Sequence, residues 1–352
     1  MRVKLEDVCV RGSSNLKQSD VIDKIGEYPI YGAAGYIGNV DFYHQDQPYV
    51  AVVKDGAGIG RTSLYPAKSS VIGTMQYLLP KENVLPEYLC YVVKYMHLEK
   101  YFTGATIPHI YFKEYKKEEF NLDTLDKQKE IVNILGRIEC VISSRQQELQ
   151  KLDELIKARF VEMFGDLANP ECLWNKSKLI EVCVDKDDIK CGPFGTQLSK
   201  DEYMESGIAV WEIPQINTAF KSRPVHFITS EKAEQLKAYT IIPGDIAMSR
   251  KGNVGKCAIF PENYPAGIIH SDVLRIRINS QLVNPTFMMC QLHFSGAITR
   301  QIELVSSGAI MAGVNVTKLK QIYVHIPPIE LQSQFADFVR AIDKSKVIKL
   351  SN

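Results

Sequence analysis

The chain contains two copies of one sequence pattern, and this internal repeat limits the possible folds more than any other feature. Segment 4–10 (KLEDVCV) returns as segment 178–184 (KLIEVCV). A match this short can arise by chance, so it carries weight only if further matches follow in the same order.

Three further matches follow in that order. Segment 48–66 (PYVAVVKDGAGIGRTSLYP) corresponds to 244–261 (GDIAMSRKGNVGKCAIFP). Both consist of a strand-like run, a glycine loop flanked by basic residues, a short second strand and a proline. Gly104-Ala105 then pairs with Gly308-Ala309, and a constant offset carries Gln128 onto Gln332. The chain is therefore predicted to fold as two similar halves, each ending in a helix.

Length and composition agree with two domains. The 352 residues exceed what one hydrophobic core usually holds, and 45% hydrophobic with 24% charged residues is ordinary globular usage. The sequence shows neither an apolar signal segment at its start nor an apolar run long enough to span a membrane, so we expect a cytoplasmic protein. Its eight cysteines form no C-x-x-C pair, and we expect no metal site.

The glycine loops are the first candidate functional sites. Lys54 and Arg61 flank the loop of the first copy, whereas Arg250, Lys251 and Lys256 flank that of the second copy. Glycine allows backbone amides to approach a phosphate closely, and the flanking cations supply the opposite charge. The alternative is a tight hairpin with solvated cations. The net charge of +1 does not decide between the two.

Residues 125–165 give the clearest helix. Its apolar positions follow steps of four and three, as in a coiled coil, and some forty residues span about 60 Å. The second copy has a shorter helix after Pro327-Pro328. Because one exposed seam is unstable, we expect the two helices to pair antiparallel, with the copies related by an approximate two-fold axis. The expected pairing residues are Ile131, Leu135, Ile138, Ile142, Leu149, Leu152, Leu331, Phe335, Val339 and Ile342.

Taken in order, these segments resemble the DNA specificity subunits of type I restriction-modification systems. The phrases that carry the resemblance are 28–38 (YPIYGAAGYIG), 192–196 (GPFGT), 244–255 (GDIAMSRKGNVG) and 326–332 (IPPIELQ), and the resemblance covers essentially the whole chain. It implies an α+β protein with two mixed α/β target recognition domains, residues 1–124 and 168–327. A spacer helix at 125–167 and a short conserved helix at 328–352 would separate them.

The resemblance also implies what the chain does and what it binds. Each recognition domain would read half of a bipartite site on double-stranded DNA, and the helices would dock two methyltransferase subunits, with restriction/translocase subunits joining the complex. Catalysis and S-adenosylmethionine binding would belong to the partners. In agreement, the sequence contains no N/D-P-P-Y/F tetrad of an adenine methyltransferase, and we predict no catalytic residue and no cofactor on this chain.

Base edges are read by bidentate polar side chains, and phosphates are bound by cations and backbone amides. We expect these groups on the glycine loops, the Gly-Ala segments and the 197–200 loop. His109 and Tyr111 in the first copy correspond to Gly313 and Asn315 in the second, as expected if each copy reads a different sequence. The candidate DNA-binding residues are Lys54, Arg61, Thr106, His109, Tyr111, Lys113, Gln197, Lys200, Arg250, Lys251, Asn253, Lys256, Asn315 and Lys318.

Two other functions remain open from the sequence. Glu114-Tyr115-Lys116 fits the E-x-K element of a metal-dependent nuclease, although the second copy has Lys318-Leu319-Lys320 there and lacks the carboxylate. A coiled-coil scaffold that does not bind DNA would explain the long helix but not the paired basic loops. Digestion of DNA with Mg²⁺ would identify the nuclease, and salt-dependent duplex binding would exclude the scaffold.

Overall fold

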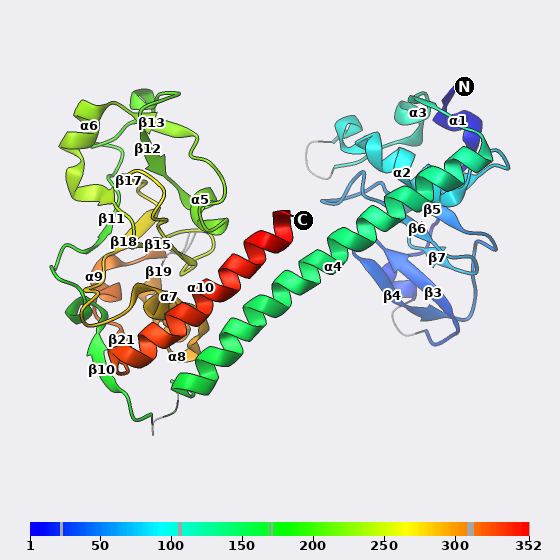
Figure 1. Cartoon of the computed structure of the whole chain (residues 1–352). Helices are drawn as coiled ribbons and strands as arrows, with labels where there is room; N and C mark the ends of the chain where they lie inside the picture. The colour runs from blue at the N-terminus through cyan, green and yellow to red at the C-terminus, as the bar shows by residue number, and fades with distance from the viewer. Residues whose placement is uncertain (22–23, 105–107, 168, 170–171, 308–312, 352) are drawn as a thin grey trace. The chain divides into compact units, whose positions relative to one another are not determined.

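The computed structural model in Figure 1 describes residues 1–21, 24–104, 108–167, 169, 172–307 and 313–351. The chain divides into two compact units, Met1–Ser144 and Arg145–Asn352. Helix α4 (Leu125–Phe164) begins in the first unit and ends in the second, so it belongs to both.

The first unit is built on a sheet with the strand order β2-β8-β5-β6. A second sheet, β4-β3-β7, contains one parallel pair, β3 with β7, and β1 pairs antiparallel with β9 just before α4. The elements are β1 (Arg2–Lys4), α1 (Leu5–Val8), β2 (Cys9–Ser13), β3 (Tyr28–Gly32), β4 (Gly35–Val40), β5 (Tyr49–Val53), β6 (Thr62–Tyr65), β7 (Ser70–Val71), β8 (Met75–Pro80), α2 (Pro86–Tyr95), α3 (Phe112–Tyr115) and β9 (Glu119–Asn121), with 3-10 turns at Gln18–Asp20 and Leu98–Tyr101.

The second unit repeats this plan with a sheet of order β11-β18-β15-β16 and a parallel pair, β12 with β17, in its other large sheet. Strand β10 pairs with β21 before the last helix, as β1 pairs with β9. Its strands are β10 (Asn175–Lys178), β11 (Ile189–Cys191), β12 (Ile208–Trp211), β13 (His226–Ile228), β14 (Thr240–Ile241), β15 (Ile246–Ser249), β16 (Cys257–Ile259), β17 (Gly267–Ile269), β18 (Val273–Ile276), β19 (Ser306–Ser307), β20 (Gly313–Val314) and β21 (Tyr323–Ile326).

The helices of the second unit cover these strands. They are α5 (Ile213–Asn217), α6 (Ser230–Gln235), α7 (Pro285–Phe294), α8 (Gly296–Val305), α9 (Val316–Leu319) and α10 (Ile329–Ser351), with 3-10 turns at Leu179–Val182, Lys200–Glu202 and Lys237–Tyr239. Both units contain a four-stranded antiparallel sheet, a sheet with one parallel pair and a strand pair before a long helix, which confirms the internal repeat. Among helices in the described ranges, none has the length and apolarity needed to cross a membrane.

The central strand of each main sheet explains why these segments fold as they do. Val50 and Val52 of β5 face a core that includes Leu89 of α2, whereas Tyr49, Ala51 and Val53 face a second buried cluster. Strand β15 alternates in the same way between two clusters. A strand covered on both faces needs an almost continuous apolar sequence, which is what both copies contain.

The last helix packs against the second half of α4 inside the second unit. Phe335, near the start of α10, lies 5.5 Å from Phe160 and 5.6 Å from Phe164, measured between ring centroids. Further along α10, the ammonium group of Lys346 lies 2.8 Å from the carboxylate of Asp153, which precedes Phe160 in α4. The two helices are therefore antiparallel, as predicted and as Figure 1 shows in red and green.

The predicted pairing residues have different surroundings. Leu331, Phe335, Val339 and Ile342 join the core cluster that contains Ile156, Phe160 and Phe164 of α4, and Leu149 and Leu152 are half-buried. Ile131 packs against the core of the first unit, and Leu135 is half-buried. Ile138 and Ile142 are 50% and 51% exposed, so a partner for this part of the seam remains a prediction.

A fully buried glutamine fixes the start of each long helix. Oε1 of Gln128 accepts the N–H of Leu85 at 2.9 Å, and its Nε2 donates to the carbonyl oxygens of Asn83 and Asp123. Gln332 makes the corresponding bonds to the N–H of Asn284 and the carbonyl of Pro327, at 2.8 and 2.7 Å. Both glutamines are 0% exposed, so these bonds replace water for buried backbone groups.

Candidate nucleic-acid interface

In the first unit, the glycine-rich segment forms the turn between β5 and β6. The N–H of Val53 donates to the carbonyl of Arg61, and the N–H of Gly60 donates back to the carbonyl of Val53, both at 2.9 Å. Gly60 has a φ of +80°, and a Cβ there would lie 2.7 Å from the backbone nitrogen of Glu99. Only glycine fits this conformation and this close approach without strain.

The same two bonds close the turn between β15 and β16 in the second unit. The N–H of Ser249 donates to the carbonyl of Lys256 at 2.8 Å, and the N–H of Gly255 donates to the carbonyl of Ser249 at 3.1 Å. Gly255 has a φ of +82°, close to that of Gly60. The sequence alignment of the two loops is therefore confirmed.

Each glycine loop is hydrogen-bonded to a residue that follows the Gly-Ala pair of its own copy. The N–H of Ile110 donates to the carbonyl of Lys54 at 2.9 Å, and the N–H of Val314 donates to the carbonyl of Arg250 at 3.0 Å. Ala105 and Thr106 in the first copy and the Gly308-Ala309 pair in the second lie outside the described residues. In each unit a backbone hydrogen bond therefore joins the glycine loop to a residue more than fifty positions later in the chain, which the sequence could not show.

Two candidate residues of the first unit, Lys54 and His109, meet at Asp55. Nδ1 of His109 lies 2.6 Å from one carboxylate oxygen of Asp55, and the ammonium of Lys54 lies 3.9 Å from the other. Tyr111 is 51% exposed, and the ammonium of Lys113 lies 5.5 Å from its ring centroid. This arrangement leaves an exposed aromatic and an exposed cation beside a carboxylate-bound imidazole.

Arg61 is tied to a different part of the first unit. Its Nη1 donates to the carbonyl of Ala33, in the turn between β3 and β4, at 3.0 Å. The residue is exposed, and a guanidinium has five N–H donors, so donors remain for an external acceptor.

The cations of the second glycine loop have more internal partners than the sequence suggested. The guanidinium of Arg250 donates to the carbonyls of Val314 and Ser271, at 3.2 and 3.4 Å. The ammonium of Lys251 lies 2.8 Å from the carboxylate of Asp272. Lys256 is half-buried and lies beside His293 at a cavity wall. These residues remain candidates for DNA contact, but Arg250 already holds neighbouring loops.

The remaining candidates of the second unit are exposed. The side-chain oxygen of Gln197 accepts the hydroxyl of Tyr239 at 3.0 Å. Oδ1 of Asn315 accepts the N–H of Lys318 at 3.0 Å and so caps α9. An amide that caps a helix is held in one orientation. Lys200, Asn253 and Lys318 have exposed side chains available to an external partner.

Several residues of this surface were missed by sequence reasoning. Asp55 and Asp272 neutralise cations of the two glycine loops, and strands β16 and β17 lie between Asp272 and its partner Lys251 in the chain. Phe194 belongs to the GPFGT phrase, and the centroid of its ring lies 5.4 Å from the guanidinium carbon of Arg250. One signal for these residues was present in the sequence, because Asp55 directly follows Lys54 and could be expected to lie near its ammonium group.

The E-x-K element is arranged differently from a nuclease site. Tyr115 is fully buried, the Glu114 carboxylate lies 3.4 Å from Lys113, and the Lys116 ammonium lies 2.8 Å from Glu6. Across the described residues, no cluster of three or more His, Cys, Asp or Glu side chains could hold a metal ion. Within the described residues, the side chains of Glu114 and Lys116 therefore have separate ion-pair partners.

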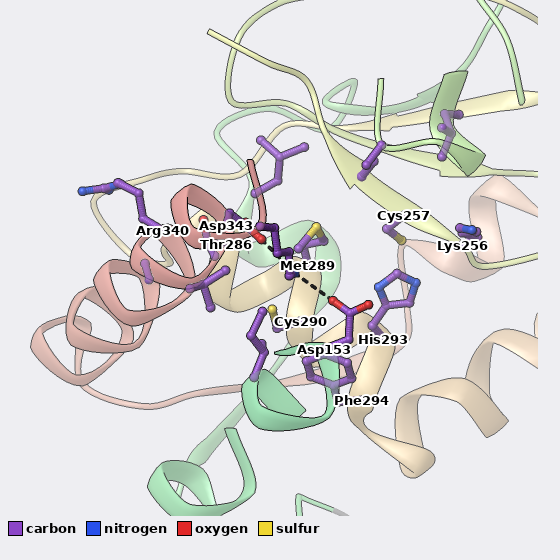
Figure 2. Close-up of a pocket in the computed structure, with 18 of the residues that line it drawn as sticks. Asp153, Lys256, Cys257, Thr286, Met289, Cys290, His293, Phe294, Arg340 and Asp343 are labelled. Atoms are coloured by element: carbon purple, nitrogen blue, oxygen red, sulfur yellow. Dashed lines mark hydrogen bonds and ion pairs between the residues drawn. The ribbon is translucent and has the colours of Figure 1, made fainter. Parts of the chain in front are cut away.

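A cavity of about 1130 Å³ lies in the second unit between the helix pair and the β15–β16 hairpin. Figure 2 shows Met289, Cys290 and Phe294 among the residues that line it, together with Lys256 and His293. Burial and the nearby charge of Lys256 lower the pKa of His293. Burial raises the pKa of the Cys290 thiol to about 12, which keeps it protonated and unreactive.

The fold and these loops define a class of protein: two related α/β units, each presenting a basic glycine loop beside a second loop, and a long helix shared between them. The chain belongs to the family described as the type I restriction modification DNA specificity domain, whose sequence profile matches residues 1–154 and 173–351. The two matched stretches coincide with the two copies of the repeat.

Individual relatives agree with this family. A putative type I restriction enzyme MjaX specificity subunit from Methanocaldococcus jannaschii is 22% identical over 338 residues, which cover 89% of this chain and 73% of that protein. The crystal structure of the type I restriction-modification system S subunit from M. genitalium matches with a TM-score of 0.61 and 14% identity, covering 100% of this chain and 91% of that one. At that identity the match concerns the fold alone.

Proposed function

We propose that the chain is the non-catalytic, sequence-specific DNA-binding subunit of a type I restriction-modification complex, and that each unit reads one half of a bipartite target on double-stranded DNA. One observation carries the proposal. Both units hold the same pair of loops with the same backbone hydrogen bonds, but the polar side chains on the loops differ. Loops that share a backbone arrangement but carry different side chains are suited to reading two different half-sites.

The exposed polar groups divide into two roles in this proposal. Lys113, Lys200 and Lys318 are exposed cations on the loops and suit phosphate contacts, which set affinity and position. Gln197, Asn253 and Asn315 carry amides that can pair with base edges, and His109 and Tyr111 present polar rings on the first unit. Lys54, Arg61, Lys251 and Lys256 flank the turns and support the phosphate contacts.

We further propose that partner subunits bind α4 where its apolar face is exposed. Ile134, Ile138, Val141 and Ile142 are 51%, 50%, 58% and 51% exposed. A helix face of this kind gains stability when another helix covers it. Methyltransferase subunits, two per complex, are the proposed occupants, and restriction/translocase subunits would join them.

The proposal also covers the cofactor and the location. S-adenosylmethionine would bind to the methyltransferase, with no cofactor on this chain. Because the proposed target is DNA, we propose a cytoplasmic location.

The decisive experiment maps methylated adenines across a genome that expresses the partner subunits, with and without this chain. The expected result is methylation of one motif with two specific parts separated by an unspecific spacer, present only when the chain is present. Purified chain that cleaves DNA with Mg²⁺ would support the nuclease alternative. An assembled complex that shows no salt-dependent duplex binding would support the scaffold alternative.

A further inference from the structure

Phe194 is an exposed aromatic residue at the apex of a well-anchored loop. Its carbonyl accepts the N–H groups of Gln197 and Leu198, at 2.7 and 3.1 Å, and Leu198 is 6% exposed. At the other end of the loop, Gly192 is packed so tightly that a Cβ would lie 2.2 Å from the carbonyl oxygen of Ile269. The loop is therefore fixed on both sides, while 51% of Phe194 remains exposed.

Arg250 connects this loop to the glycine loop and to two other segments. Its guanidinium carbon lies 5.4 Å from the centroid of the Phe194 ring. The same side chain donates to the carbonyls of Val314 and Ser271, and its backbone N–H donates to the carbonyl of Asp272 at 2.8 Å. A planar guanidinium held by two carbonyls has a fixed orientation, so it offers a fixed surface to the ring over which it lies.

Lys251 reinforces this arrangement from the next position. Its ammonium pairs with Asp272 at 2.8 Å, in the segment that Arg250 also binds. In the first unit the position of Arg250 is held by Lys54, whose ammonium lies near Asp55. A lysine has no planar fork with which to bridge two carbonyls and a ring. The arrangement is therefore a property of the second unit.

We propose that Phe194 makes an apolar contact with a nucleobase of the second half-site, and that Arg250 is a positioning residue that holds its ring. The inference rests on the proposed function. One face of the ring lies toward the guanidinium, and half of the side chain is open to solvent at the surface that carries the other candidate residues. Apolar side chains on such a surface read DNA either at the C5-methyl group of thymine or by insertion between stacked bases.

The first test measures Phe194→Ala in the assembled methyltransferase complex. The probes are a synthetic duplex with the motif found by methylation mapping and a scrambled duplex of equal length. Affinity for the motif should fall about 5- to 100-fold, and affinity for the scrambled duplex should stay the same. Tyr323→Ala is the matched control, because Tyr323 is 52% exposed on β21, outside these loops. An unchanged motif affinity for Phe194→Ala overturns the inference.

The second test separates positioning from direct phosphate contact at Arg250. If Arg250 positions Phe194, both Arg250→Lys and Arg250→Ala should lose motif affinity while the dependence of log K on log salt stays constant. Adding Phe194→Ala to either should then cause little further loss. If Arg250 binds a phosphate, Arg250→Lys should keep its affinity and Arg250→Ala should reduce the salt slope by about one. That second pattern overturns the positioning role.

The third test identifies the apolar group on the DNA. Replacing each thymine of the second half-site by deoxyuridine removes its methyl group, and 2-aminopurine at each step reports unstacking through its fluorescence. For the wild type, one position of the half-site should show either a loss of affinity with deoxyuridine or a change in 2-aminopurine fluorescence on binding. Phe194→Ala should show neither change at that position. If neither probe distinguishes the two proteins, the ring contacts no base and the inference fails. A wild-type complex that methylates no two-part motif would instead contradict the proposed function itself.

Discussion

Arg250 and Val314 are joined by two hydrogen bonds that run in opposite directions. The N–H of Val314 donates to the carbonyl of Arg250 at 3.0 Å, and Nε of Arg250 donates to the carbonyl of Val314 at 3.2 Å. The backbone bond recurs in the first unit between Ile110 and Lys54, at 2.9 Å. The backbone arrangement of these loops is thus common to both units while the side chains on it differ, as the proposed function requires if the two units read two different sequences.

The buried glutamine at the start of α10 should be important for stability. Gln332→Ala leaves the N–H of Asn284 and the carbonyl of Pro327 without their partner in a site that water does not reach. The free energy of unfolding should fall by about 1–3 kcal/mol, measured by denaturant titration. Gln334→Ala is the control because Gln334 is exposed in the same helix, and it should change stability little. Equal effects of both variants would contradict this role.

The exposed face of α4 should matter for assembly but not for the stability of the chain. Ile138→Asp with Ile142→Asp alters side chains that are half exposed, so the melting temperature should change little. Complex formation with the methyltransferase, followed by size-exclusion chromatography, should be abolished because charges would be buried at the interface. Phe335→Ala, in the aromatic core of the second unit, should instead destabilise the chain by about 3–5 kcal/mol. An intact complex with the double variant would exclude this docking face.

Recognition should be modular. Exchanging residues 1–120 for those of a relative replaces the loops of the first unit and leaves the loops of the second unit unchanged. Methylome sequencing should therefore reveal a motif in which one half is new and the other half is retained. A change in both halves, or in neither, would show that the units do not read DNA independently.

Exposed lysines of the second unit should set the salt dependence of binding. Replacing Lys200 and Lys318 by Ala removes two cations next to the candidate loops. The slope of log K against log salt should fall by roughly one for each DNA phosphate that these lysines neutralise in the wild type. Lys221→Ala with Lys237→Ala removes the same charge from exposed positions outside the proposed DNA-binding set. Identical slopes for the two double variants would place the phosphate-binding residues elsewhere.

Acid should destabilise the second unit through His325. This residue is 3% exposed, and burial together with the charge of Lys176 lowers its pKa below the ordinary 6.5. The unfolded chain then binds more protons than the folded chain, so stability is complete above about pH 6.5 and decreases as the pH falls below it. His325→Phe should reduce the loss of melting temperature between pH 7 and pH 5. If the melting temperature of the variant fell between pH 7 and pH 5 as much as that of the wild type, another group would cause the acid sensitivity.

Much of the fold followed from local sequence patterns. The heptad spacing predicted a helix at 125–165, and α4 covers Leu125–Phe164, with Gly165 at a φ of +75° after its end. Pro327-Pro328 predicted where the second helix could begin, and α10 starts at Ile329. These predictions succeed because periodic burial and backbone restrictions act within a few residues of each other.

The partners within the candidate site could not be predicted in this way. Asp272, Ser271 and Val314 meet Arg250 only because β18 pairs with β15 and because the segment before α9 returns to the glycine loop. The sequence suggested a phosphate-binding arginine, which stays a prediction, and it gave no sign that this guanidinium also donates to two carbonyls of neighbouring segments. Likewise, the heptad pattern did not reveal that Ile131 packs on the first core while Ile138 remains exposed.

The sequence by itself determined that this protein has two similar halves, a glycine loop in each half and a long helix with an apolar seam. These properties depend on repetition, periodicity and the conformational freedom of glycine, all of which are visible along one chain. Only the tertiary structure decided which cations on the loops are free and which already bind carbonyls or carboxylates. A side chain's availability depends on neighbours that are distant in sequence and are brought close by strand pairing and core packing.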